Sequence, residues 1–136
     1  MIMRLDGMTR SAAALIGLCA IAATGLTASC FSERATATIL TIDPALCTGS
    51  RPPNVVIIRG FAFEPTELRV APGTEVMWAN CEPAGTEAHT STSDGAAWNS
   101  GLLPPLNGYA RTFSQTGSFP YHCEPHPFMQ ATIVVQ

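Results

Sequence analysis

Apolar and polar residues alternate in short stretches along the second half of the chain, and turn residues separate the stretches. The β-branched run 55–58 is followed by Phe61 and Phe63 at a spacing of two, and residues 74–80 alternate as well. No helical period is sustained in this half. Short strands at this spacing predict an all-β fold, an antiparallel β-sandwich. The other predicted strands are 67–70, 108–113, 118–123 and 131–135.

The first 29 residues have the pattern of a secretory signal. Arg4 and Arg10 provide a positive start, residues 11–26 carry no charge, and small residues follow up to Ser29. A stretch of 16 apolar residues is short for a membrane-spanning helix, which needs about 20. We therefore expect residues 1–29 to be removed on export to the periplasm or the cell surface.

Cys30 comes directly after the small residues, as the acylated cysteine of a bacterial lipoprotein does. Thr27 occupies the place where such sites usually have a bulky residue, so a lipid anchor and simple release both stay open. Residues 30–53 are rich in Thr and Ala, end in two prolines and are predicted to be a linker. Residues 54–136 form the predicted domain.

Composition supports one compact domain. The 136 residues are 46% hydrophobic and 12% charged, which suits a buried core and argues against disorder. The chain has no lysine and a net charge of −3. Without a basic surface, nucleic acid is not an expected partner.

A short loop near the C-terminus combines three side chains that bind metals. Cys123, His126 and Met129 follow one another at intervals of three residues. Sulfur ligands favour Cu(I), and imidazole binds both oxidation states of copper. Two histidines and a cysteine in a trigonal set, with a weak axial methionine, form the copper site of electron-transfer proteins. The loop predicts such a site, with a second histidine from elsewhere.

The chain has three histidines, so the second imidazole belongs to His89 or His122. His122 precedes Cys123 on a predicted strand, where neighbouring side chains point to opposite faces. We therefore expect His122 at the surface and His89 at the metal. No histidine is then left for a second site, so the prediction is one copper ion that alternates between Cu(I) and Cu(II). The predicted ligands are His89, Cys123, His126 and Met129.

Two other interpretations of these residues stay open. Zinc could bind Cys123, the two histidines and an acid such as Glu124, but zinc has little use for methionine and usually takes paired Cys or His ligands. Cys123 could also be an inert buried residue beside unrelated histidines. The softness and the spacing of the ligands favour copper.

The five cysteines can be sorted by position. Cys19 lies inside the predicted signal and Cys30 at its end, and an oxidising compartment favours pairing two of the other three. If Cys123 is a metal ligand, the pair is Cys47 and Cys81. That disulfide closes a loop of 34 residues (81 − 47) and stabilises the fold by about 4 kcal/mol. The alternative is two small buried thiols.

Residues 54–136 resemble the small blue copper proteins, the cupredoxins. This resemblance implies a Greek-key β-sandwich with the copper ion near one end, between the C-terminal loop and the strand that bears His89. The motifs that carry it are Phe63-Glu64-Pro65, Val76-Met77-Trp78-Ala79-Asn80, Ala88-His89-Thr90 and the stretch from Gly117 to Met129.

The chain departs from the family pattern around His89. Cupredoxins of the plastocyanin and amicyanin type usually have proline before this histidine and asparagine after it, where this chain has Ala88 and Thr90. In the family the second position ties the two ligand segments together, so we expect that tie to be altered. The stretch 81–87 is also unusual.

By the same resemblance, His126 exposes its ring edge through a hydrophobic patch where redox proteins dock. Pro125, Pro127 and Phe128 are predicted to form part of the patch. The leucines and prolines of residues 102–106 either complete it or fill the core. We expect a monomer, with membrane contact only through a lipid on Cys30.

The predicted function is a type 1 copper protein that carries single electrons between redox partners outside the cytoplasm. The alternative is a copper delivery or buffering protein without a redox role. Such proteins tend to use Met- and His-rich sites without thiolate, and beyond residue 30 this chain has only Met77 and Met129. An enzyme is disfavoured by the small number of histidines.

Overall fold

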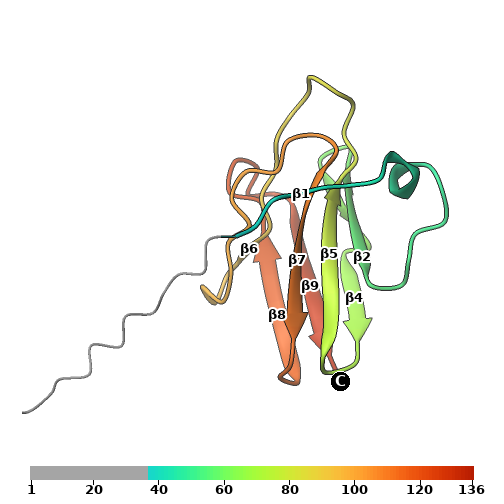
Figure 1. Cartoon of the computed structure of the whole chain (residues 1–136). Coiled ribbons are helices and arrows are strands. Elements are labelled where there is room, and N and C mark those ends of the chain that lie inside the picture. The colour runs from blue at the N-terminus through green and yellow to red at the C-terminus, as the bar shows by residue number, and fades with distance from the viewer. Residues whose placement is uncertain (1–36) are drawn as a thin grey trace, which may run out of the picture. The chain divides into compact units, whose positions relative to one another are not determined.

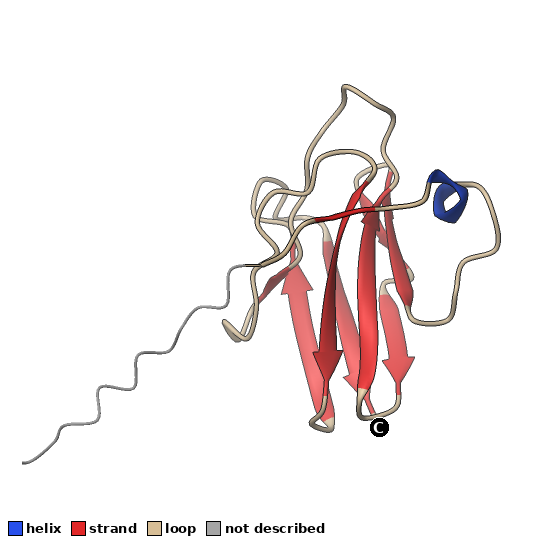
Figure 2. Ribbon diagram, in the orientation of Figure 1, coloured by secondary structure: helices blue, strands red, loops and turns tan. Residues whose placement is uncertain are grey.

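Strands make up nearly all the regular structure in the residues that the computed structural model describes, 37–136 (Figure 2). The predicted signal sequence and Cys30 lie outside this range. Within it, no helix has the length and apolar character needed to cross a membrane. A short 3-10 helix, η1 (Pro44–Cys47), is the one helical element assigned in this part of the chain.

The strands form two sheets, which confirms the predicted sandwich (Figure 1). The first sheet has the order β1-β7-β5-β2-β3, and the second has the order β4-β9-β8-β6. The bounds are β1 Leu40–Thr41, β2 Val55–Arg59, β3 Ala62–Glu64, β4 Glu67–Val70, β5 Thr74–Asn80, β6 Thr92–Ser93, β7 Asn107–Phe113, β8 Gly117–His122 and β9 Gln130–Val135.

Two of the strand pairs run parallel. β2 pairs with β5 and β4 pairs with β9 in parallel register, whereas the other pairs are antiparallel. The reason is that the chain changes sheets between β3 and β4 and again between β4 and β5, so β5 returns beside β2 from the same end. The sheets are therefore mixed rather than purely antiparallel.

The main core lies between the sheets. Alternation on β5 buries Val76 and Trp78, and alternation on β9 buries Ile133 and Val135. Trp78 is fully buried, with its ring against Tyr109, Phe113, Trp98 and Tyr121. Large aromatic side chains of this kind contribute much of the apolar area that a small sandwich buries.

A second, smaller cluster covers the other face of the first sheet. It contains Ile42, Val55, Ile57 and Ala79, with Leu46 packed against them. Both faces of β2 are thus buried, which explains why residues 55–58 are apolar without interruption. Part of the segment 30–53, predicted to be a linker, supplies this cover through Ile42, which follows β1, and through Leu46 in η1.

The predicted disulfide between Cys47 and Cys81 is confirmed. It joins the end of η1 to the residue that follows β5. The backbone N–H of Cys81 also donates to Ile58 O at 2.8 Å. The first residues after β5 are therefore fixed on both sides, and this is where the chain turns toward the predicted metal ligands.

Candidate metal centre

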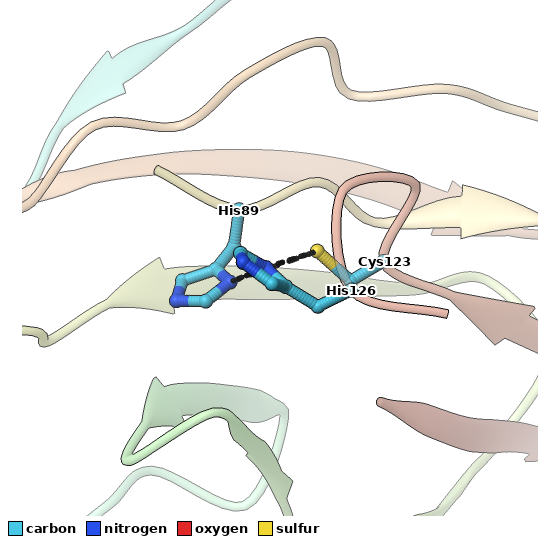
Figure 3. A group of neighbouring side chains, drawn as sticks. All are labelled: His89, Cys123 and His126. Carbon is cyan, nitrogen blue, oxygen red and sulfur yellow. Dashed lines mark hydrogen bonds between the residues drawn. The ribbon is translucent and has the colours of Figure 1, made fainter. Parts of the chain in front are cut away.

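The structure brings His89, Cys123 and His126 together at one end of the sandwich, where β5 and β8 end (Figures 1 and 3). The sulfur of Cys123 lies 3.6 Å from the Nδ1 atom of each histidine. The two Nδ1 atoms are 3.2 Å apart. Three potential donor atoms therefore converge on one point from two distant parts of the sequence.

These distances fit a single first-row metal ion. Bonds of about 2.0 Å to imidazole and about 2.3 Å to thiolate, spread around one ion, place neighbouring donors roughly 3.5 Å apart. The donor set is one soft sulfur and two imidazoles, which suits copper in both of its common oxidation states. Its geometry therefore accepts the ion that the sequence predicts.

The segment from Cys123 to Met129 is a tight loop between β8 and β9. The N–H of His126 donates to Cys123 O at 3.1 Å, and the N–H of Met129 donates to His126 O at 2.8 Å. The N–H of Cys123 in turn donates to Met129 O at 3.1 Å. Pro125 and Pro127 fix φ on both sides of His126. The loop thus holds its imidazole in place by its own backbone.

Met129, the fourth predicted ligand, closes this loop. Its side chain is buried in the same core cluster as Cys123. The intervals of three residues therefore place Cys123, His126 and Met129 in one short loop whose first and last residues are joined by a backbone hydrogen bond.

His89 comes from the other side of the site and is fully buried. Its backbone forms an isolated antiparallel bridge with Leu103, with hydrogen bonds in both directions. The side chain of Asn80, also fully buried, donates to the carbonyl groups of Leu103 and Glu87. The last residue of β5 thus anchors both segments that hold His89.

Thr90 joins the two ligand segments. Its N–H lies 3.4 Å from the Cys123 sulfur, and its hydroxyl oxygen accepts a hydrogen bond of 2.8 Å from the N–H of Glu124. Thr90 stands where the family usually has asparagine, and we expected the tie between the two segments to be altered there. The two segments are still joined. A hydroxyl group and the backbone together form the tie.

Burial lowers the pKa of His89 below the ordinary value of an imidazole. The neighbouring His126 lowers this pKa further, because two positive rings would repel each other at this distance, while Glu82 opposes both effects. His89 is therefore held in its neutral form, the form that binds metal ions.

His122 lies outside the donor cluster, as the alternation of β8 predicts. Its ring is partly exposed and pairs with Asp94. Its neighbours Tyr121 and Cys123 are buried on the opposite side of the strand.

Two residues near the donors were not singled out as site residues from the sequence. The ring of Phe61 lies edge-on to both imidazoles, with centroids 5.5 Å from His89 and 5.0 Å from His126. A carboxylate oxygen of Glu82 lies 3.4 Å from the Nε2 atom of His89. Phe61 looked like an ordinary strand residue, and Glu82 looked like a charged residue in a surface loop.

Known proteins with similar sequence or structure are copper proteins. Residues 54–136 match the model of the family described as "Copper binding proteins, plastocyanin/azurin family". Amicyanin from Paracoccus denitrificans is 34% identical over 84 residues, which are 60% of this chain and 64% of that protein. The chain thus spans just under two thirds of that relative. Amicyanin from Paracoccus versutus is 29% identical over 131 residues, 93% of this chain and 95% of that one.

A solved structure gives the same picture for the fold. The oxidized state of a proline-to-alanine mutant of amicyanin matches with a TM-score of 0.55 and 30% identity, over 74% of this chain and 99% of that chain. Since the family match covers residues 54–136, more than half of the chain, and includes the converging cysteine and histidines, the chain belongs to the plastocyanin/azurin family of copper-binding proteins, and is a cupredoxin.

Proposed function

We propose that this protein carries single electrons between redox partners outside the cytoplasm, with one copper ion bound by His89, Cys123, His126 and Met129. The observation that carries the proposal is the convergence of one sulfur and two Nδ1 atoms within 3.6 Å of each other. Copper bound by such ligands accepts and returns one electron.

The residues around the donors suit this task because they restrict motion. His89 and Cys123 are fully buried, so water is kept from two of the donors. His126 sits between two prolines in a loop closed by backbone hydrogen bonds. A rigid, dry set of donors changes little in geometry between oxidation states, and this favours fast electron transfer.

His126 provides the approach for a partner. It is only half-buried, whereas His89 is fully buried. Three large apolar side chains near this end are exposed: Phe61, Leu102 and Phe128, at 43%, 55% and 70%. Phe61 and Phe128 lie beside the ring of His126, with centroids 5.0 Å and 6.0 Å away. We propose that redox proteins dock on these side chains.

The backbone of Phe61 supports this role. Its φ is 59°, in the left-handed region, and so is that of the preceding Gly60 at 58°. Such a conformation costs a residue with a side chain about 1–2 kcal/mol, and turns of this kind favour glycine or asparagine. An exposed phenylalanine held at this cost points to a function for its ring.

Of the leucines in 102–106, one belongs to this surface and the others do not. Leu102 is exposed, Leu103 is fully buried in the main core, and Leu106 packs on the smaller cluster. The sequence left open whether these leucines complete the patch or fill the core, and different leucines do each. From this stretch, the proposed docking surface includes Leu102 alone.

The disulfide supports export. Disulfides form and persist in oxidising compartments such as the periplasm and the cell surface. The Cys47–Cys81 bond therefore favours a location outside the cytoplasm. We propose export by a signal in residues 1–29, either with release or with a lipid on Cys30, and a monomeric carrier.

Copper loading of the purified protein tests the proposal. We expect one copper ion per chain, a reversible one-electron couple and strong visible absorption from a thiolate–Cu(II) bond. Cys123→Ser should abolish the absorption because the thiolate is lost. His122→Gln is the matched control, since it removes the third histidine, which stands next to Cys123 but outside the donor cluster.

The outcomes separate the candidate functions. A colourless Cu(II) form would favour copper delivery or buffering without a redox role. A zinc ion retained in the presence of copper would favour a structural zinc site. Met129→Leu should keep the colour, since three ligands remain, but change the reduction potential, which the axial ligand tunes.

A further inference from the structure

Glu82 is a buried acid beside the proposed ligands. It is 8% exposed, which is rare for a carboxylate without a partner. One of its oxygens, Oε1, accepts a hydrogen bond of 3.0 Å from the N–H of Phe61. The same oxygen lies 3.4 Å from the Nε2 atom of His89. A single carboxylate oxygen therefore faces one proposed ligand and the turn that carries the exposed Phe61 ring.

The backbone around Glu82 aims this side chain. Its N–H donates to the Oδ1 atom of Asn80 at 3.0 Å, and Asn80 is fully buried. The residue before it, Cys81, is held by the disulfide to Cys47 and by a hydrogen bond to Ile58. The backbone at Glu82 is thus restrained just after the end of β5, although the residues that follow it, 83–87, are exposed.

The Nε2 atom of His89 lacks any other partner. It is buried, and no group in the described part of the chain makes a hydrogen bond to it. When Nδ1 of a histidine binds a metal, Nε2 carries the proton and almost always donates it to a carboxylate, a carbonyl or a water.

We propose that Glu82 is the positioning residue of this centre: it accepts the Nε2 proton of His89 and at the same time holds the Phe61 turn over the two imidazoles. This inference rests on the proposed function, since it assumes that His89 binds copper through Nδ1. By fixing the proton on Nε2, Glu82 keeps Nδ1 free and directed at the Cys123 sulfur. By holding the N–H of Phe61, it couples the orientation of a ligand to the proposed docking surface.

The charge of the carboxylate adds a second effect. An anion hydrogen-bonded to a ligating imidazole makes that ligand more basic and favours the more highly charged Cu(II) over Cu(I). Removing the charge should weaken Cu(II) binding more than Cu(I) binding. The reduction potential should then rise.

Glu82→Gln tests this with Glu87→Gln as the matched control. Both variants remove one negative charge from the same loop, but Glu87 is exposed and acts on His89 through its charge alone, whereas Glu82 is buried in contact with the His89 ring. For Glu82→Gln we expect Cu(II) affinity to fall about tenfold or more. If Cu(I) affinity is unchanged, each tenfold loss raises the potential by about 59 mV. Glu87→Gln should change both values less than Glu82→Gln does, because the Glu87 charge acts on His89 more weakly than the Glu82 charge.

A second measurement uses the wild-type protein, so it stands even if Glu82→Gln fails to fold. In the Cu(I) form, nitrogen NMR should show His89 protonated on Nε2, and the amide proton of Phe61 should exchange slowly with solvent. Copper found on Nε2 of His89, or a Phe61 amide that exchanges as fast as an exposed turn amide, would overturn the inference.

The proposed function and the role of Glu82 are contradicted by different results. If the wild-type protein shows no thiolate–Cu(II) absorption, the proposed function fails. If the wild type is blue and Glu82→Gln has the same affinity and potential as Glu87→Gln, the proposed function stands and the role of Glu82 is wrong.

Discussion

The backbone N–H of Thr90 lies 3.4 Å from the sulfur of Cys123, and the Thr90 hydroxyl accepts the N–H of Glu124. Each contact joins the segment of the buried histidine to the segment of the cysteine. The first contact uses only the backbone of residue 90, so it tolerates any side chain at that position that keeps the local conformation. The second contact depends on the hydroxyl, so the tie can be divided by mutation into two parts.

Thr90→Val should remove the second part. Valine has the shape of threonine but no hydroxyl, so the partly buried N–H of Glu124 loses its acceptor. We expect the free energy of unfolding to fall by about 1–3 kcal/mol, measured by urea denaturation of the metal-free protein. Thr90→Ser keeps the hydroxyl and should lose less. Equal losses in both variants would show that the methyl group, not the hydrogen bond, matters.

The disulfide should stabilise the fold without determining the metal site. Cys47→Ala combined with Cys81→Ala opens a loop of 34 residues, which should lower the free energy of unfolding by about 4 kcal/mol. The copper spectrum should keep its thiolate band, because the hydrogen bond from Cys81 N–H to Ile58 O stays. A double variant with wild-type urea resistance would contradict this view, and reduced wild-type protein serves as the comparison.

Much of the fold could be predicted from the sequence, because apolar and polar residues alternate along a strand wherever only one of its faces is buried. Residues 67–70 and 74–80 were predicted as strands and are β4 and β5. Two-residue strands such as β6 carry no period that could be detected. Pairing direction was not predictable either, since the parallel pair β2–β5 has the same side-chain pattern as an antiparallel one.

The three candidate donors that the fold brings together could be predicted for a different reason. Cys123 and His126 are close in sequence, and the small number of histidines left few choices for the second imidazole, His89. Glu82 and Phe61 were missed because their positions depend on loops that meet only in the folded chain. Nothing local distinguishes a glutamate that will be 8% exposed from one in a solvated loop.

The rate of electron exchange between two copies of the protein should fall when a charge is added to the proposed docking surface. A charge added at the other end of the sandwich should not lower it. Phe128→Glu places a carboxylate on the most exposed of the three apolar side chains. Electron exchange between oxidised and reduced copies requires two such surfaces to meet, so like charges should slow it at low salt. NMR line broadening in mixtures of the two forms measures this rate.

Thr116→Glu is the matched control for that experiment. It adds the same charge in the exposed turn between β7 and β8, away from the end that holds the donor cluster (Figure 1). Its exchange rate should stay near that of the wild type. An equal slowing in both variants would mean that net charge, rather than the patch around His126, controls the encounter.

The metal-free protein should lose stability in mild acid. Because burial lowers the pKa of His89, the folded protein keeps this ring neutral while the unfolded chain takes up a proton below about pH 6.5. The unfolded state then binds more protons, so the free energy of unfolding falls as the pH falls. Urea midpoints at pH 7.5 and pH 5.5 should show the loss, and His89→Gln should reduce it. An equal loss in the wild type and in His89→Gln would contradict this explanation.

Tyr121 allows the opposite end of the pH range to be tested. Its side chain is 1% exposed and lies between Phe63 and Trp78, with ring centroids 4.8 Å and 5.5 Å away. Within the described residues neither the Tyr121 hydroxyl nor the Trp78 Nε1 has a hydrogen-bond partner. Burial raises the pKa of Tyr121, and the nearby Trp78 offsets the rise only in part.

Tyr121→Phe should therefore act in two ways. Near neutral pH it removes a buried hydroxyl without a partner, so the free energy of unfolding should stay the same or rise by up to about 2 kcal/mol. Above about pH 10 the unfolded chain loses the phenolic proton that the folded protein keeps, so the wild type becomes less stable as the pH rises. The variant should lack this part of the loss, and Tyr109→Phe, the matched control at the other tyrosine, should retain it. Equal alkaline losses in wild type and Tyr121→Phe would mean that folding does not raise the pKa of Tyr121.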